Sequence, residues 1–182
     1  HNTPLDCSVL ENLFLEKGIL KSFNKNDYFL RQGDKDRYIG YVATGFFRLS
    51  RIDSNGNEWI IGYGFEHDFV CDYPAMMQNK EASVNIQAST GCTVYLLSFR
   101  ELNDFWETDM NTQRLGRNMA ETMFSEIAQR LYSFYDTPEQ RYITLMQRCP
   151  RLQERLTLKE IASFIGVPPE TVSRIRKNLL YK

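Results

Sequence analysis

The chain has 182 residues, of which 42% are hydrophobic and 25% are charged, and this composition excludes an intrinsically disordered protein. No apolar run approaches the roughly 20 residues that cross a bilayer, and no signal-peptide pattern opens the chain, so we expect a cytoplasmic protein without a membrane partner. The net charge of −1 is unevenly divided, with +5 on residues 137–182 and −6 on residues 1–136. A basic C-terminal module on an acidic body suits a phosphate-rich partner.

The first predicted element is a short amphipathic helix over residues 6–17, capped by Asp6 or Ser8. After it the hydrophobic period changes to two, and short runs rich in aromatic and β-branched residues predict strands. We expect these strands at residues 28–31, 38–43, 46–52, 58–64, 84–88 and 93–98. Asn55-Gly56 supplies positive φ for a hairpin turn, and the series of short antiparallel strands predicts a sandwich or roll within residues 1–108.

The cysteines and histidines of the chain do not form a recognisable catalytic or metal-binding pattern. Cys7, Cys71, Cys92 and Cys149 include no Cys-x-x-Cys pair, so we interpret them as small buried hydrophobic residues without metal or disulfide partners. A metal enzyme on a cupin-like barrel needs several inward histidines, and the chain has only His1 and His67. We therefore expect no enzyme, no catalytic residues, no metal and no cofactor.

One long helix is predicted next, within residues 109–136. Its apolar surface is wider than one stripe because Ala120, Phe124 and Ala128 extend it. We expect one face to pack on the roll and another to form the interface of a homodimer; the alternative is a helix that lies wholly on its own domain. The predicted interface residues recur at spacings of three and four and are Leu115, Met119, Met123, Ile127 and Leu131.

Thr137-Pro138 begins another helix and marks the start of a last domain, residues 137–182. Within it, residues 158–177 have the spacing of a helix-turn-helix. Small Ala162 suits the close approach of two helices, and Gly166 suits a left-handed turn. Thr157 and Glu160 form a capping box, and Pro169 fits the first turn of the second helix. The side chains that we expect to be buried between the helices are Ile161, Ile165, Val167, Val172 and Ile175.

The opposite face of the second helix carries polar and charged side chains that suit recognition of double-stranded DNA. Arg174 can donate two hydrogen bonds to guanine, and Glu170 can accept one from cytosine. The alternative is a solvated charged face on an ordinary helical hairpin. The complete set of predicted DNA-binding residues is Thr157, Lys159, Pro169, Glu170, Thr171, Ser173, Arg174, Arg176 and Lys177.

Roll, long helix and helix-turn-helix follow one another in an order that resembles the CRP/FNR family, the cAMP-receptor-protein-like bacterial transcription regulators. The resemblance extends over nearly the whole chain. It implies an α+β fold with an N-terminal cyclic-nucleotide-binding-like antiparallel β-roll, a dimerisation helix and a C-terminal DNA-binding domain, and RNA polymerase as a further partner. In that family the equivalents of Glu170 and Arg174 read base edges, although the residue before Glu170, often an arginine, is Pro169 here. The motifs that carry the resemblance are Gly33-Asp34, Tyr41-Val42-Ala43-Thr44-Gly45, Gly56-Asn57-Glu58, His67-Asp68-Phe69-Val70 and Glu170-Thr171-Val172-Ser173-Arg174.

The effector region departs from the family's cyclic-nucleotide pattern. Members that bind cAMP hold the ribose with Gly-Glu and the phosphate with Arg-Ser, where this chain has Cys71-Asp72 and Ala82-Ser83. Without the arginine, a buried phosphate lacks its two-pronged cationic partner, so the signal is expected to be an unidentified small molecule other than cAMP. The predicted effector pocket consists of Phe69, Cys71, Asp72, Tyr73, Ala82 and Ser83, with Met76 and Met77 as either pocket or core residues.

Two other interpretations stay open: a regulator that needs no ligand and uses its roll only as a dimerisation scaffold, and a cyclic-nucleotide-responsive regulator. The fumarate-nitrate branch needs clustered N-terminal cysteines, which the single Cys7 does not supply. The family usually has a two-stranded wing after the recognition helix, whereas this sequence ends at Lys182. We expect that the wing is either absent from this branch or truncated, so that Lys159, Arg176, Lys177 and Lys182 carry more of the phosphate contacts.

Overall fold

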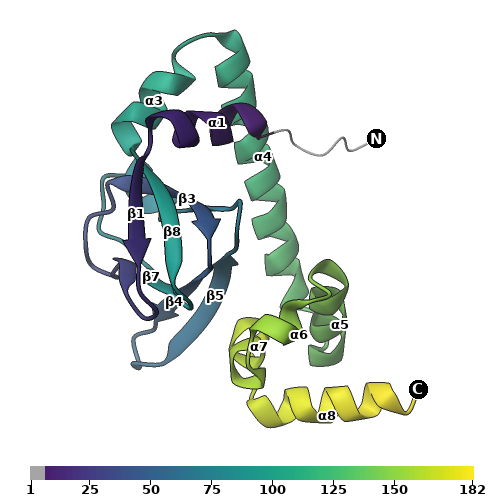
Figure 1. Cartoon of the computed structure of the whole chain (residues 1–182). Helices are drawn as coiled ribbons and strands as arrows, with labels where there is room; N and C mark the ends of the chain where they lie inside the picture. The colour runs from purple at the N-terminus through teal and green to yellow at the C-terminus, as the bar shows by residue number, and fades with distance from the viewer. Residues whose placement is uncertain (1–6) are drawn as a thin grey trace. The chain divides into compact units, whose positions relative to one another are not determined.

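The computed structural model describes residues 7–182, so His1 and Asp6 lie outside the described residues. The chain forms two compact units, of which the first ends at Ala120 and the second is Glu121–Lys182. Figure 1 shows the elements along the chain, and the division falls inside the long helix α4 (Met110–Ser133). The predicted three-part division with boundaries at residues 108 and 136 stays a prediction. No helix in the described part of the chain is long and apolar enough to span a bilayer.

The first unit is an antiparallel β-roll accompanied by helices, as the alternating pattern predicted. Its helices are α1 (Ser8–Lys17), α2 (Tyr73–Met77), α3 (Phe99–Trp106) and the first half of α4. Its strands are β1 (Ile19–Phe23), β2 (Tyr28–Leu30), β3 (Tyr38–Thr44), β4 (Phe47–Ile52), β5 (Glu58–Gly64), β6 (Phe69–Val70), β7 (Asn85–Ala88) and β8 (Cys92–Ser98).

All six predicted strands are confirmed to within two residues, and the N-terminal helix is confirmed as α1. The prediction missed β1 because only its last residue, Phe23, is buried, so the strand has no alternating pattern. It also missed two-residue β6 and the short helices α2 and α3. Ser8 was the wrong choice for a cap of α1: the N-cap residue is Cys7, without a side-chain hydrogen bond, and Ser8 is the first helical residue.

The roll consists of two four-stranded sheets with the orders β1-β8-β3-β6 and β2-β7-β4-β5. Every pairing between these strands is antiparallel. Between the sheets lies an apolar core in which the rings of Phe23 and Phe47 meet edge to face at 5.5 Å. Gly56 takes the positive φ (+81°) of the β4–β5 turn, which confirms the predicted hairpin.

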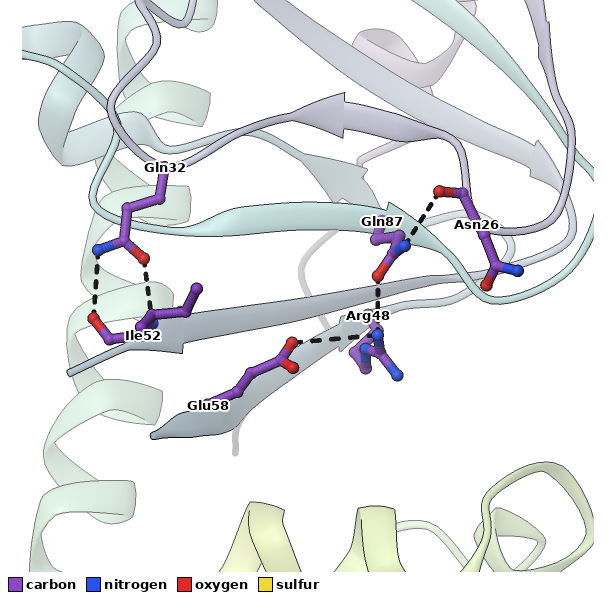
Figure 2. Close-up of polar contacts among 6 residues, drawn as sticks. All are labelled: Asn26, Gln32, Arg48, Ile52, Glu58 and Gln87. Carbon is purple, nitrogen blue, oxygen red and sulfur yellow. Dashed lines mark hydrogen bonds and ion pairs between the residues drawn. The ribbon is translucent and has the colours of Figure 1, made fainter. Parts of the chain in front are cut away.

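Polar contacts link neighbouring strands on the outer face of the second sheet. Arg48 follows buried Phe47 on β4, so its side chain lies on the opposite face. Figure 2 shows its guanidinium donating to Oε1 of Gln87 (2.7 Å) and lying 4.0 Å from Oε1 of Glu58. The Gln87 amide in turn donates to the carbonyl of Asn26 (3.0 Å). These contacts tie β4 to its two neighbours and to the turn before β2.

Hydrogen bonds of Gln32 extend the second sheet beyond the point where the backbone pairing of β4 and β7 ends. The β4–β7 ladder ends at the pair Ser50–Asn85. Beyond it, the Gln32 amide accepts from the Ile52 N–H (3.0 Å) and donates to the Ile52 carbonyl (3.2 Å), as Figure 2 shows. The Gln32 N–H donates to Oδ1 of Asn85 (2.7 Å). Through its side chain and its backbone N–H, Gln32 therefore fixes the chain before Gly33 to the end of the sheet.

A second apolar cluster joins α1, α3 and the start of α4 to strands β3 and β8. Its centre is formed by Leu10, Phe14 and Leu97, which are all buried. Leu115 and Met119 of α4 pack against this cluster and are half-buried. The predicted dimer stripe is thus divided, because its first two residues contact their own roll while Met123, Ile127 and Leu131 are exposed.

The second unit contains the end of α4 and a bundle of four shorter helices. These are α5 (Pro138–Arg148), α6 (Leu152–Arg155), α7 (Leu158–Ile165) and α8 (Pro169–Leu180). Arg130 of α4 places its guanidinium 4.0 Å above the Phe164 ring and donates to the Phe164 carbonyl (3.3 Å). Arg141 of α5 donates to the carbonyls of Phe134 and Asp136. Two arginines therefore fasten the end of α4 to the helix bundle.

Candidate functional site

Helix α7 has the predicted signals at both ends. At its start, Oγ1 of Thr157 accepts from the Glu160 N–H (3.2 Å), while the Glu160 carboxylate accepts from the Thr157 N–H (2.8 Å). This reciprocal pair is the predicted capping box. At its end, Gly166 has φ +74°, and the Val167 N–H donates to the carbonyl of Ala162 (3.0 Å). The left-handed glycine turns the chain sharply toward α8.

The two helices α7 and α8 bury the residues that the spacing predicted. Ile161 and Ala162 of α7 are fully enclosed, and Val172 of α8 is 0% exposed. Val167, in the turn, is half-buried. Since these contacts fix how α8 is rotated about its axis, they also decide which of its side chains face solvent.

The exposed face of α8 presents most of the predicted DNA-binding residues together. Pro168 is the N-cap and Pro169 the first helical residue, where a missing N–H has no intrahelical partner to lose. Glu170 and Arg174 follow one turn apart and are exposed, as are Ser173 and Lys177, whereas Thr171 is half-buried. Thr157 and Lys159 are exposed at the first turn of α7.

Two predicted phosphate-binding cations have partners within the second unit. The Arg176 Nε donates to Oη of Tyr142 (3.0 Å), and its half-buried side chain points toward α5 and not to the exposed face of α8. The Lys182 Nζ forms an ion pair with Oε1 of Glu139 (2.8 Å). Sequence spacing did not reveal these contacts because both partners lie on α5, more than 30 residues away.

A groove of about 470 Å³ runs between the first turn of α5 and the side of α8. On α5, Oγ1 of Thr137 accepts from the Gln140 N–H (3.2 Å), which leaves the Glu139 N–H without a partner inside its own helix. On α8, Thr171, Arg174 and Asn178 line the opposite wall. The sequence identified Thr137-Pro138 as a helix start but gave no signal that this start lies beside α8.

In the effector region, Asp72 is a buried internal acceptor. Its side chain is only 7% exposed, and it caps α2 by accepting from the Ala75 N–H (3.2 Å). Its second oxygen accepts from the Ser83 N–H (2.8 Å), and its own N–H donates to the Asp36 carboxylate (2.7 Å). Asp72 therefore ties together both ends of the segment 72–83.

The other predicted effector residues have three different surroundings. Ala82 belongs to the core between the sheets, with 4% exposure. The Phe69 ring packs on the rings of Phe14 (5.2 Å) and Tyr41 (5.4 Å) in the second cluster. Tyr73 meets the Phe99 ring edge to face at 6.0 Å. Buried Met76 joins the second cluster, whereas Met77 is exposed.

Burial also sets the protonation of this region. Burial raises the pKa of the Asp36 carboxyl, and the nearby Asp72 adds to the effect. Burial raises the pKa of the Cys71 thiol as well, which the Asp36 and Asp72 carboxylates reinforce. A thiol with a raised pKa stays protonated and is a poor nucleophile or metal ligand. All four cysteines are free thiols, and residues 7–182 contain no group of three His, Cys, Asp or Glu side chains placed to hold a metal ion.

In comparisons with known proteins, the chain is similar to bacterial transcription regulators. Residues 20–109 match the family model of the cyclic nucleotide-binding domain. The chain is 24% identical to the cAMP-activated global transcriptional regulator CRP of Salmonella typhimurium over an alignment of 182 residues, which covers 91% of this chain and 84% of that protein. Its fold is similar to that of FixK2 from Bradyrhizobium japonicum, with a TM-score of 0.78, 17% identity, and coverage of 90% of this chain and 85% of that one.

A second solved structure with a similar fold is the c-di-GMP responsive global regulator CLP of Xanthomonas campestris. Its TM-score is 0.71 at 16% identity, and the match covers 97% of this chain and 92% of that one. At such identities the two structures establish the architecture alone. They agree with the predicted α+β arrangement of antiparallel roll, long helix and C-terminal helices.

Proposed function

We propose that this chain binds specific DNA sequences as a homodimer and thereby regulates transcription. The premise is that it belongs to the CRP/FNR-like regulators and carries a cyclic nucleotide-binding domain. The observation that carries this proposal is the exposed row Glu170, Ser173, Arg174 and Lys177 on α8, opposite buried Val172. A helix held this way can enter the major groove with its polar face toward the bases. In this role the protein is a regulator and not an enzyme. It acts in the cytoplasm, where its DNA partner lies, and RNA polymerase is its further partner.

In this proposal the residues of α8 divide the work of recognition. Arg174 donates to O6 and N7 of a guanine, and Glu170 accepts from N4 of a cytosine. Ser173, Lys177 and Lys159 contact phosphates, which positions the helix without reading sequence. The capped start of α7 at Thr157 holds the turn beside the DNA backbone.

The charge pattern of the groove between α5 and α8 supports a phosphate contact at this edge. Glu139 is the one acidic side chain that lines the groove, and its pairing with Lys182 (2.8 Å) offsets that negative charge. The helix dipole at the start of α5 and the Arg174 guanidinium on α8 then make the groove attractive to an anion. Lys182 would act here through Glu139 and not through a phosphate of its own.

The homodimer would form along the second half of α4. Met123, Phe124, Ile127 and Leu131 are exposed there, with Phe124 75% exposed. An apolar stripe of this kind is unfavourable in water and suits pairing with the same stripe of a second copy. Since α4 is fastened to the bundle by Arg130, a change in helix pairing would move the recognition helices, which must be about 34 Å apart to reach successive major grooves.

For the signal we propose a molecule other than cAMP. Both Asp72 oxygens are occupied by N–H groups of the chain itself, and Ala82 belongs to the apolar core. A ribose would have to compete with these bonds, and a buried cyclic phosphate would meet no cation at residue 82. Two relatives named above respond to cAMP and to c-di-GMP, so the fold is compatible with different effectors. Because the Asp72 contacts already order the segment 72–83, a regulator that needs no ligand is the second candidate.

Selection of binding sites from a pool of random DNA tests the proposal. The expected product is an inverted repeat whose half-sites are separated by one helical turn, since a symmetric dimer reads a symmetric site. A pool in which no sequence is enriched after repeated rounds would contradict the proposal.

In a separate titration, cAMP and cGMP should give no rise in melting temperature, whereas true binding at 100 times Kd would add about 2.7 kcal/mol of stability.

A further inference from the structure

We infer that the roll has a binding pocket for a small aromatic carboxylate, beside β1 and apart from the segment 72–83 that the family comparison highlights. The pocket has a volume of about 150 Å³. It opens where β1, which lies next to β8 in Figure 1, approaches strand β2 and the connection between β2 and β3. All of its lining residues belong to the first unit.

The floor of this pocket is apolar and suits a flat ring. Phe23 and Leu30 are core residues that reach its base, and Phe29 and Leu96 are partly buried beside them. The rings of Phe23 and Phe29 are 5.9 Å apart and tilted by 44°. A cavity of about 150 Å³ with apolar walls accommodates a ligand of the size of benzene. Drug-sized ligands need cavities of about 300 Å³ or more, so a nucleotide is too large for this one.

The rim of the pocket is cationic. Lys21, Lys35 and Arg37 line it, and all three side chains are exposed. The Lys35 ammonium is held in place by the carbonyl (2.6 Å) and the side-chain oxygen (3.3 Å) of Asn79. An ammonium has three donors, so one N–H of Lys35 stays available to a ligand. The Lys21 ammonium lies over the Phe23 ring, 4.9 Å from its centre, and so above part of the apolar floor.

One carboxylate, Asp36, also lines the pocket, and its oxygens are directed to backbone donors. It accepts from the N–H of Asp72 (2.7 Å) and from the N–H of Tyr38 (3.4 Å). Three cations against one internally bonded carboxylate leave an excess of positive charge around an apolar floor. An anionic group attached to a single ring satisfies both features, whereas an inorganic anion would not use the floor and a neutral ring would not use the rim.

Benzoate is the probe for this pocket, with benzamide as the neutral ring and acetate as the anion without a ring. Isothermal titration of the purified chain without DNA should show saturable binding of benzoate at millimolar concentrations or below. Benzamide and acetate should each bind at least tenfold more weakly. Lys21→Gln and Arg37→Gln should each weaken benzoate about tenfold, because each removes a charged donor. Lys25→Gln, which removes an exposed charge outside the pocket lining, should leave benzoate affinity within twofold.

Proton contacts between benzoate and the Phe29 and Leu96 side chains, measured by NMR, should locate the ring in the pocket. No saturation at 10 mM would overturn the inference, as would equal binding of benzamide or an equal loss in the Lys25→Gln control. Because the titration contains no DNA, failure of the pocket leaves the proposed DNA recognition unaffected, and failure of DNA recognition leaves the pocket unaffected.

Discussion

The roll and the helix-turn-helix unit use their polar side chains in opposite ways. In the roll, Asp72 is buried and both of its oxygens accept from neighbouring backbone N–H groups. In the second unit, Glu170 and Arg174 are exposed on a helix whose other face carries buried Val172 and Ile175. The same class of side chain therefore stabilises the chain in one region and is presented to solvent in the other. Under the proposed function, the second unit therefore has its DNA-reading side chains exposed before any partner is bound.

A charged substitution on the exposed apolar stripe of α4 should have the largest effect. Replacing Met123 and Ile127 with Asp places two carboxylates where two stripes would meet, so we expect a monomer in sedimentation measurements. Affinity for a selected inverted repeat should fall by 100-fold or more because the two half-sites are no longer bound together. The double variant Ser125→Asp and Gln129→Asp adds the same charge on the opposite face and should stay dimeric. A dimer with Asp at 123 and 127 would remove α4 from the interface.

The next effect concerns the internal acceptors of the roll. Asp72→Asn replaces one acceptor oxygen with an NH2 group, which cannot accept from an N–H, so either Ala75 or Ser83 loses its partner. We expect the free energy of unfolding of the roll to fall by about 1–3 kcal/mol, measured by urea denaturation. An unchanged stability would mean that the segment 72–83 is ordered by other contacts.

Asp36→Asn is the matched control, with a distinct pH signature. Burial raises the pKa of Asp36 above its usual value of 3.8, so the folded chain binds this proton more tightly than the unfolded chain. The contribution of Asp36 to stability therefore falls as pH rises from 3.8 through the raised pKa. The amide keeps an oxygen for the Asp72 N–H and removes the buried charge. We expect a change within about 1 kcal/mol at pH 7 and loss of this pH dependence.

The contrast between the two units also explains what could be predicted from the sequence. The buried face of α8 follows from helical periodicity within 20 residues, and Gly166 and Thr157 mark the helix ends through local chemistry. The role of Asp72 depends on Ser83 and Asp36, which reach it through the folding of the roll. Arg176 likewise meets Tyr142 across 34 residues. No local pattern encodes such contacts, so the fold and the exposed face of α8 were predictable and the surroundings of the effector residues were not.

The smallest effect separates two lysines that looked equivalent in the sequence. Lys177 is exposed on α8, so Lys177→Ala should reduce the slope of log K against log salt by about one, as expected for one lost phosphate contact. Lys182 is paired with Glu139, so Lys182→Ala should change that slope by less than half as much. Equal reductions in both variants would show that the ion pair opens and that Lys182 binds phosphate directly.

Substitution of Arg174 tests the central claim, that the exposed face of α8 reads bases, most directly. Affinity is measured for the selected site and for a scrambled duplex of the same length at one salt concentration. Arg174→Ala should weaken binding to the selected site by about 1–3 kcal/mol, roughly 5- to 150-fold, and binding to the scrambled duplex by much less. Arg174→Lys should fail to restore the selected site, because an ammonium cannot reproduce the two-pronged contact. Equal losses on both duplexes, with recovery by lysine, would show that Arg174 contacts only the phosphate backbone and would contradict the claim.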